Sequence, residues 1–270
     1  MDAALGDFGQ LTRKITSDRG FICASYKEKC LRRRIAVRMR ARGVHTYGDY
    51  ASLLDRDALE YDRLLDTLTI NVTKLFRNWE VYDALARYVV PELWGRELQS
   101  IRVWSAGCSS GHEAHSLAIL FHRHAADCGM LQQLARVEVL GTDIDRACLA
   151  AAERGEYVEA DFADTPPELR ERYFSSTAPF TVAPAIRAMV RFERRDLLTE
   201  RPQPGACDLL VCRNVLIYFD RDTQIRLFDM FSDALAPGGY LLLGKVETLL
   251  GGSRARFTPV DARERIFVRR

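Results

Sequence analysis

The sequence predicts an α/β domain with a doubly wound parallel sheet, preceded by an all-helical N-terminal domain. From Ile101 onward, short apolar stretches alternate with amphipathic ones, as strands and crossover helices do in a parallel sheet. The first 75 residues show helical spacing alone. We therefore expect a helical domain over residues 1–75 and an α/β domain over residues 76–270, with a short β excursion at about residues 175–190.

Apolar side chains at helical spacing indicate the buried faces of the N-terminal helices. Leu31, Ile35 and Met39 repeat every four residues and form one apolar stripe. Thr46 suits the N-cap of the helix that follows, because its hydroxyl can accept a backbone N–H bond. The spacing over residues 59–68 predicts a further helix.

The α/β domain opens with an apolar strand from Ile101, a turn of small residues and a helix. Ala106 and Gly107 let the backbone approach a ligand, and the helix N-terminus offers N–H groups. A second apolar strand ends at Asp143, which can accept the hydroxyls of a ribose, although Asp143 or Asp145 could instead cap the next helix. The turn lacks the complete glycine pattern of a dinucleotide site, so a mononucleoside with a short charged tail, such as S-adenosylmethionine, fits better.

Five segments of the chain, in this order, carry a family resemblance. They are residues 69–77, 103–116, 141–145, 208–219 and 235–244. Together they resemble the CheR-type chemotaxis receptor glutamate methyltransferases, from about Gly20 to Val268. The resemblance implies a Rossmann-like domain that transfers the methyl group of S-adenosylmethionine to glutamate side chains of a chemoreceptor and releases S-adenosylhomocysteine. The implied partners are the cytoplasmic helices of the receptor.

The resemblance also implies roles for single residues. Those implied to contact the cofactor are Asn71, Thr73, Arg77, Glu113, Asp196, Leu197, Arg213 and Asn214. Glu113 would hold the ammonium of the methionine part, and Asp196 would accept from the adenine amino group. Arg213 and Asn214 would flank the adenosine. In the same family a small antiparallel subdomain docks a receptor tether, and the stretch near residues 175–190 is its short counterpart here.

The catalytic candidates implied by the resemblance are Arg77, which would face the reaction centre, and Tyr218, which would lie near the transferred methyl. Each assignment has a structural alternative. Glu113 could be a first-turn acid that suits the helix dipole, Thr73 could be an N-cap, and Tyr218 could be a core aromatic residue.

Residues 111–116 depart from the usual family pattern at His112, Ala114 and His115. Cofactor binding should survive, because the missing proline mainly pre-sets the start of a helix. His112 and His115 are three residues apart and no third ligand has metal-site spacing, so no metal is expected. We expect these histidines at the surface or between the domains.

Basic residues gather between Lys27 and Arg42, where eight positive charges accompany a single acid, Glu28. Such a run can be a solvated helix face. Arg33 and Arg40 point away from the apolar stripe of the same helix. We therefore expect these two arginines to bind the substrate, a carboxylate-rich helical partner that they would steer and orient.

The composition limits the class of protein. With 270 residues, 47% of them apolar and 28% charged, the chain is typical of a soluble globular protein. We expect no signal peptide and no membrane span, and seven cysteines without a C-x-x-C pair favour a reducing, cytoplasmic setting. The net charge of +2 gives no sign of nucleic-acid binding, and we expect a monomer.

Two other functions stay open at this level. An N-methyltransferase acting on an amide or a base would show an Asn-Pro-Pro-Tyr type motif after the fourth strand, where this chain has Asn214-Val215-Leu216-Ile217. A sensor module that binds S-adenosylmethionine without catalysis would keep the cofactor motifs. The departures within residues 111–116 leave that second alternative open.

Overall fold

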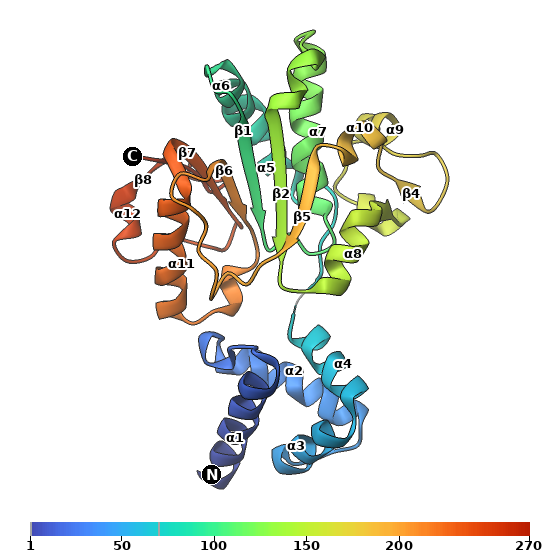
Figure 1. Ribbon diagram of the computed structural model, residues 1–270, viewed down its shortest axis with the longest axis vertical. Coiled ribbons are helices and arrows are strands. Elements are labelled where there is room, and N and C mark those ends of the chain that lie inside the picture. The colour runs from blue at the N-terminus through green and yellow to red at the C-terminus, as the bar shows by residue number, and fades with distance from the viewer. Residues whose placement is uncertain (1, 70) are drawn as a thin grey trace. The chain divides into compact units, whose positions relative to one another are not determined.

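The computed structural model describes residues 2–69 and 71–270 and divides the chain into two compact units. One comprises Met1–Ile70 and Tyr218–Gln224, and the other comprises Asn71–Ile217 and Ile225–Arg270. We call them the helical unit and the α/β unit (Figure 1). The domain boundary expected at residue 75 stays a prediction.

Helices build the helical unit. They are α1 (Asp2–Arg19), α2 (Glu28–Ala41), α3 (Tyr47–Arg56) and α4 (Ala58–Leu68), with the short 3-10 helix η1 (Cys23–Ser25). The predicted stripe is confirmed, because Leu31, Ile35 and Met39 are buried in the core of this unit. Thr46 caps α3 as expected, since its hydroxyl accepts the N–H of Asp49 at 3.1 Å.

The α/β unit alternates strands and helices. Its strands are β1 (Ile101–Ala106), β2 (Val137–Asp143), β3 (Glu156–Tyr157), β4 (Phe180–Thr181), β5 (Val190–Arg194), β6 (Cys207–Cys212), β7 (Leu235–Leu243), β8 (Phe257–Asp261) and β9 (Ile266–Arg269). Its α-helices are α5 (Trp79–Ala84), α6 (Val90–Gly95), α7 (His112–Asp127), α8 (Arg146–Arg154), α9 (Pro167–Tyr173), α10 (Pro184–Arg187) and α12 (Ser253–Arg256). It also contains the π-helix η2 (Leu85–Val89) and the 3-10 helices η3 (Leu131–Arg136) and η4 (Glu159–Phe162). Residues of both units contribute to η5 (Leu216–Tyr218) and α11 (Arg221–Ala234).

The main sheet confirms the doubly wound α/β fold. Within the described residues it has seven strands in the order β5-β2-β1-β6-β7-β9-β8. The strands from β5 to β7 run parallel, whereas β9 and β8 are antiparallel to their neighbours. In the register, Val103 of β1 pairs with Val139 of β2 and with Leu209 of β6. Apolar side chains of three adjacent strands therefore lie in one row.

Helices lie on both faces of this sheet (Figure 1). Val103 belongs to the same buried core as Leu117 of α7. Trp104, the next residue, points to the opposite face, where its ring lies 6.3 Å from the ring of Phe231 of α11. α7 and α11 thus cover opposite faces of the sheet, and β6 is buried along its whole length.

A second, antiparallel pair of strands, β3 and β4, lies apart from the main sheet in the described chain. β4 falls in the stretch where the β excursion is expected, and its partner β3 comes from the segment after α8. Aromatic packing supports this pair, because Phe162 contacts the rings of Phe174 and Phe180 edge-on.

Two features concern the described residues as a whole. None of their helices is both long and apolar enough to cross a membrane. Within residues 2–69 and 71–270, the seven cysteines form no disulfide. Cys108, Cys207 and Cys212 are buried and act as small core side chains.

Candidate functional site

The turns that follow β1 and β6 meet at the point where the strand order reverses. In the strand order, β2 lies next to β1 in one direction, whereas β7 lies next to β6 in the opposite direction. Ligands of open α/β sheets bind at the carboxyl ends of the strands at such a point. Gly107 follows β1 with φ +82°, and a Cβ there would lie 2.6 Å from Cγ2 of Val215 in the turn after β6. Glycine is therefore needed at position 107 for both its backbone conformation and its lack of a side chain. The preceding Ala106 is fully buried.

Asp143 ends β2 at the same edge of the sheet. Its Oδ2 accepts the N–H of Ser109 at 2.8 Å, and its Oδ1 accepts the N–H of Asp145 at 3.0 Å. Burial raises the pKa of Asp143, and the backbone donors offset part of that rise. Each carboxylate oxygen can accept a further hydrogen bond. The carboxylate is thus fixed in place and still able to receive ribose hydroxyls.

Asp145, rather than Asp143, caps α8. Its Oδ1 accepts two backbone N–H groups of the first turn of that helix, at 2.8 and 3.0 Å. Its Oδ2 accepts from Nδ2 of Asn71 at 2.8 Å. The helix-cap alternative for Asp143 therefore does not apply. Asn71 is held next to the carboxyl end of β2.

Residues 71–78 form an irregular segment that the α/β unit holds through its backbone. The N–H of Phe76 donates to Oγ of Ser116 in α7 at 2.9 Å. The N–H of Asn78 donates to Oδ2 of Asp164 at 2.8 Å. Phe76 and Asn78 both have positive φ values, 50° and 62°. Such strained backbone occurs where the surrounding structure fixes it, as at ligand sites.

Arg77 lies between these two strained residues. Its Nη1 donates to the carbonyl of Val72 at 3.0 Å, which uses one of the five N–H donors of the guanidinium. Thr73 is half-buried in the same segment and does not begin a helix, because α5 begins at Trp79. The N-cap alternative for Thr73 is therefore wrong. That Thr73 and Arg77 contact a ligand stays a prediction.

Glu113 and Arg213 form a buried pair at the reversal point. Nη1 of Arg213, which follows β6, lies 3.8 Å from Oε2 of Glu113 in the first turn of α7. Oε1 of Glu113 accepts the hydroxyl of Ser105 at 2.8 Å. Burial raises the pKa of Glu113, against the opposing effect of Arg213. Nη2 of Arg213 also donates to the carbonyl of Arg77 at 2.9 Å. Arg213 therefore connects the expected ammonium-binding acid to the segment that carries Arg77.

The turn after β5 brings Asp196 and Leu197 to this edge as well. The N–H of Arg195 donates to the carbonyl of Asp143 at 3.0 Å, which joins the ends of β5 and β2. Oδ1 of Asp196 accepts the N–H of Leu198 at 2.8 Å and fixes the turn. Both Asp196 and Leu197 are half-buried.

Three of the expected site residues, Tyr218, Arg33 and Arg40, belong to the helical unit. The carbonyl of Tyr218 accepts the N–H of Lys27 at 2.9 Å. The guanidinium of Arg34 lies 5.2 Å from the centre of the Tyr218 ring. Tyr218 is half-buried, whereas a core aromatic residue would be fully buried.

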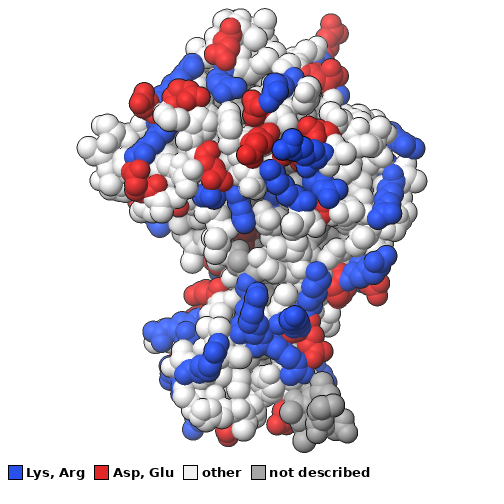
Figure 2. Space-filling model, turned by 180° about the vertical axis from the view of Figure 1, so that it is seen from behind, with Lys and Arg blue, Asp and Glu red and all other residues white. Residues whose placement is uncertain are grey.

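The basic run of α2 divides into held and exposed arginines. Partners within the helical unit hold Arg32, Arg34, Arg38 and Arg42. Nε of Arg38, for example, donates to the fully buried carboxylate of Glu60 at 3.0 Å. Arg33 and Arg40 are exposed, as the stripe predicts. Figure 2 shows that basic side chains predominate on the displayed face of the helical unit.

Glu247, just after β7, was not predicted from the sequence. It is 4% exposed, and its Oε2 accepts the N–H groups of Asn214 at 3.0 Å and Gly244 at 2.7 Å. The available signal was its position, because it is an acid shortly after an apolar parallel strand, as Asp143 is. That signal alone does not distinguish it from a surface glutamate.

Comparison with known proteins identifies the family. Residues 71–266 match the family described as CheR methyltransferase, SAM binding domain, and residues 6–69 match CheR methyltransferase, all-alpha domain. The chain belongs to the CheR methyltransferase family. The chemotaxis protein methyltransferase of Listeria innocua is 35% identical over 245 residues, which cover 90% of each chain. Chemotaxis protein methyltransferase 1 of Pseudomonas aeruginosa is 33% identical over 256 residues, which cover 92% of each chain.

The α/β unit is thus the S-adenosylmethionine-binding domain of a CheR methyltransferase. Its residues fit this cofactor. Among the described residues, the buried Nε of Arg213 has no hydrogen-bond partner, and buried polar atoms normally have one. A ligand with a carboxylate and an ammonium, as the methionine part has, could satisfy both Arg213 and its neighbour Glu113.

Two histidines of this CheR domain correct an expectation. His112 and His115, expected at the surface or between domains, are buried inside the α/β unit, and His115 has no exposed surface. Nδ1 of His115 hydrogen-bonds the hydroxyl of Tyr157, and burial lowers the pKa of His115 to about 3. Nε2 of His112 lies 3.2 Å from Oδ1 of Asp161. The start of α7 is enclosed on several sides by segments distant in sequence, which helical spacing cannot reveal. In residues 2–69 and 71–270, no His, Cys, Asp and Glu cluster of three or more could hold a metal.

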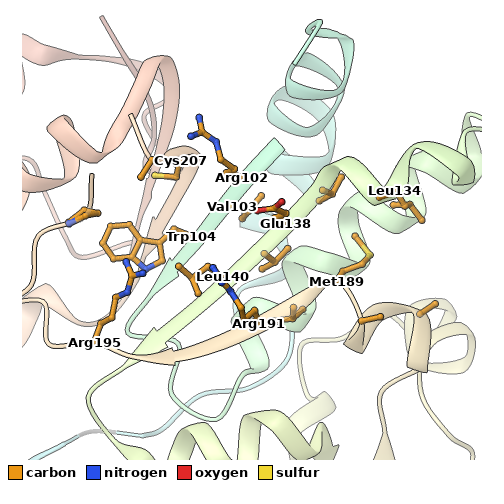
Figure 3. Close-up of a pocket in the computed structure, with 18 residues that line it drawn as sticks. Arg102, Val103, Trp104, Leu134, Glu138, Leu140, Met189, Arg191, Arg195 and Cys207 are labelled. Atoms are coloured by element: carbon orange, nitrogen blue, oxygen red, sulfur yellow. The ribbon is translucent and has the colours of Figure 1, made fainter. Parts of the chain in front are cut away.

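A cavity of about 620 Å³ lies elsewhere on the CheR domain. Figure 3 shows Trp104, Leu140 and Arg191, from β1, β2 and β5, around it. Residues 195–206, which join β5 to β6, form turns rather than a helix, so that this face of the sheet is partly open. The lining reaches Arg102, near the amino-terminal end of β1, whereas cofactors of such sheets bind at the carboxyl ends. The cavity is therefore not assigned to S-adenosylmethionine.

Proposed function

We propose that the chain is a protein-glutamate O-methyltransferase that esterifies glutamate side chains in the cytoplasmic helices of chemoreceptors. Its family supports this reaction, and its relatives in Listeria innocua and Pseudomonas aeruginosa are chemotaxis protein methyltransferases. The observation that carries the proposal is the hydrogen bond from Arg213, which is paired with Glu113, to the backbone carbonyl of Arg77. The segment of Arg77, whose guanidinium suits a substrate carboxylate, is thereby joined through Arg213 to Glu113, whose carboxylate suits the ammonium of the cofactor.

Each part of the cofactor has a proposed partner. Glu113 binds the ammonium, and Asp143 accepts the two ribose hydroxyls. Asp196 accepts from the adenine amino group, with Leu197 packed beside it. The remaining proposed contacts are Asn71, Thr73, Arg77, Ala106, Gly107 and Asn214. Arg213, which the family resemblance suggests beside the adenosine, acts on the methionine side, because its guanidinium is paired with Glu113.

The reaction needs no general base, because a glutamate with a reference pKa of about 4.3 is already ionised at neutral pH. The bound cofactor supplies a methyl group on a positively charged sulfur. Arg77 orients the glutamate through a charge-assisted hydrogen bond. That bond must be partial or bridged by water, since a tight pairing would weaken the nucleophile. In this scheme Tyr218 lies near the transferred methyl, and catalysis requires that water be excluded from the nucleophile.

Receptor recognition is assigned to the exposed arginines of α2. Among the described residues of the helical unit, no acid pairs with Arg33 or Arg40, in contrast to Arg38 with Glu60. They are suited to a carboxylate-rich helix, which they would steer and orient. We further propose a cytoplasmic monomer with a domain boundary at residue 75, and no nucleic-acid partner.

Transfer of a radiolabelled methyl group to receptor-containing membranes, followed by release of methanol in base, tests the reaction. An ester releases methanol, and this is the expected result. Label that stays bound in base would indicate N-methylation. An absence of transfer, despite cofactor binding, would indicate a sensor module.

A further inference from the structure

Glu247 is a buried carboxylate that contacts two turns of the site. It follows β7, at the same edge of the sheet as Asp143, and is 4% exposed. Its Oε2 accepts the N–H groups of Asn214 and Gly244, and its Oε1 accepts the N–H of Ile217 at 3.3 Å. One carboxylate thus joins the turn after β6 to the turn after β7.

This arrangement is specific for a carboxylate. Three N–H groups converge on the two oxygens, and an amide would direct a donor at one of them. Burial raises the pKa of Glu247, and the backbone N–H groups offset part of that rise. A buried charge persists only when such bonds compensate its lost hydration.

The turn that Glu247 holds is closely packed. Asn214 has φ +61°, in the left-handed region, which asparagine adopts more readily than most non-glycine residues. Gly244 approaches so closely that a Cβ would lie 2.7 Å from Oε2 of Glu247 and 2.9 Å from the N of Asn214. On the other side, Val215 abuts Gly107 in the turn after β1. Asn214 and Val215 are therefore fixed between the carboxylate and the cofactor turn.

We propose that Glu247 is a positioning residue for the nucleoside half of the cofactor, which it serves by holding the turn Arg213–Ile217 through the N–H groups of Asn214 and Ile217 and by joining that turn to Gly244. This role rests on the proposed function, in which Asn214 flanks the adenosine. Glu247 itself need not touch the cofactor.

The test compares Glu247→Gln with Glu264→Gln, a matched variant at a second buried glutamate. Glu264 is 5% exposed, and its carboxylate faces the side chains of Lys245 and Arg263, at 3.5 and 3.4 Å, rather than the backbone N–H groups that Glu247 binds. Calorimetry on the full chain measures the Kd of S-adenosylhomocysteine and of 5′-methylthioadenosine, which lacks the amino-acid part. Glu247→Gln should weaken both ligands by ~10-fold or more, because one misdirected N–H costs about 1.4 kcal/mol or more. Glu264→Gln should leave both affinities unchanged.

Turnover separates positioning from general damage. With saturating cofactor, Glu247→Gln should keep kcat within about threefold of the wild type, so that the loss lies in KM. If Glu247→Gln fails to fold, Gly244→Ala disturbs the same contact, and Gly95→Ala, with open space around its Cβ, is its control. Gly244→Ala should then weaken both ligands while Gly95→Ala does not.

Unchanged binding of 5′-methylthioadenosine in both Glu247→Gln and Gly244→Ala would overturn the inference, as would a loss confined to kcat. A wild-type protein that binds neither ligand would instead refute the proposed function. The two failures are therefore distinguishable.

Discussion

Replacing Asp143 by alanine should weaken S-adenosylhomocysteine binding by about 10- to 150-fold. Each oxygen of Asp143 already accepts one backbone N–H, from Ser109 or Asp145, and can accept one ribose hydroxyl besides. A hydrogen bond to a charged group contributes about 1.5–3 kcal/mol, and about 1.4 kcal/mol is a factor of ten in affinity. We count one such bond as the net loss, because water can enter the space that alanine leaves.

Calorimetry on variants with unchanged circular dichroism measures this loss. Asp57→Ala is the control, because Asp57 also accepts a backbone N–H, that of Glu60 at 2.9 Å, but in the helical unit. It should lower the melting temperature without changing affinity. A folded Asp143→Ala protein with wild-type affinity would remove Asp143 from the site.

The pH dependence gives a second readout of the same carboxylate. Burial raises the pKa of Asp143, and the ligand requires its ionised form. Affinity should therefore be complete above this raised pKa and fall as the pH drops through it, beginning above the value of about 3.9 for an ordinary aspartate. Asp143→Asn should lose that part of the acid limb, and the part due to Glu113, whose pKa is also raised by burial, should remain.

Three further outcomes are expected. Arg77→Ala should lower kcat far more than cofactor affinity, as initial rates at saturating cofactor would reveal, and normal saturated turnover with weak cofactor binding would contradict the assigned role. Arg33→Glu combined with Arg40→Glu should greatly slow methylation of receptors with and without a C-terminal tether, while cofactor affinity is unaltered. The methylation rate of the wild type should fall with added salt. An unimpaired double variant would reduce the basic run to a solubility feature. In thermal melts, Gly107→Ala should destabilise the protein more than Gly129→Ala. Both positions have left-handed φ, which costs an alanine about 1–2 kcal/mol, but only the new Cβ at position 107 would also collide with Val215. Equal losses of stability would contradict this reasoning.

Local patterns explain why the fold was predictable. The strand that ends at Asp143 and the stripe from Leu31 to Met39 depend on spacings of two and four residues, which the sequence displays directly. Parallel strands bring their carboxyl ends to one edge, so the position of Asp143 followed from its place after a strand. Its capping neighbour Asp145 followed from its place before a helix.

Contacts between distant segments explain what was not predictable. Glu247 meets Asn214 across 33 residues of sequence, and no spacing rule connects them. His115 is buried because Tyr157, from β3, closes over α7. Tyr218 follows the β6 turn in sequence, yet its segment packs with the helical unit.

The sequence by itself determined the α/β fold with its helical N-terminal part, the family and the strand-end position of Asp143, because these depend on local periodicity and on motifs in a fixed order. The tertiary structure decided which charges meet. It paired Glu113 with Arg213, directed Arg213 to the segment of Arg77, and enclosed Glu247 among backbone N–H groups. The physical reason is that burial and pairing depend on which chain segments surround a group, and that is fixed only when strands distant in sequence assemble into one sheet.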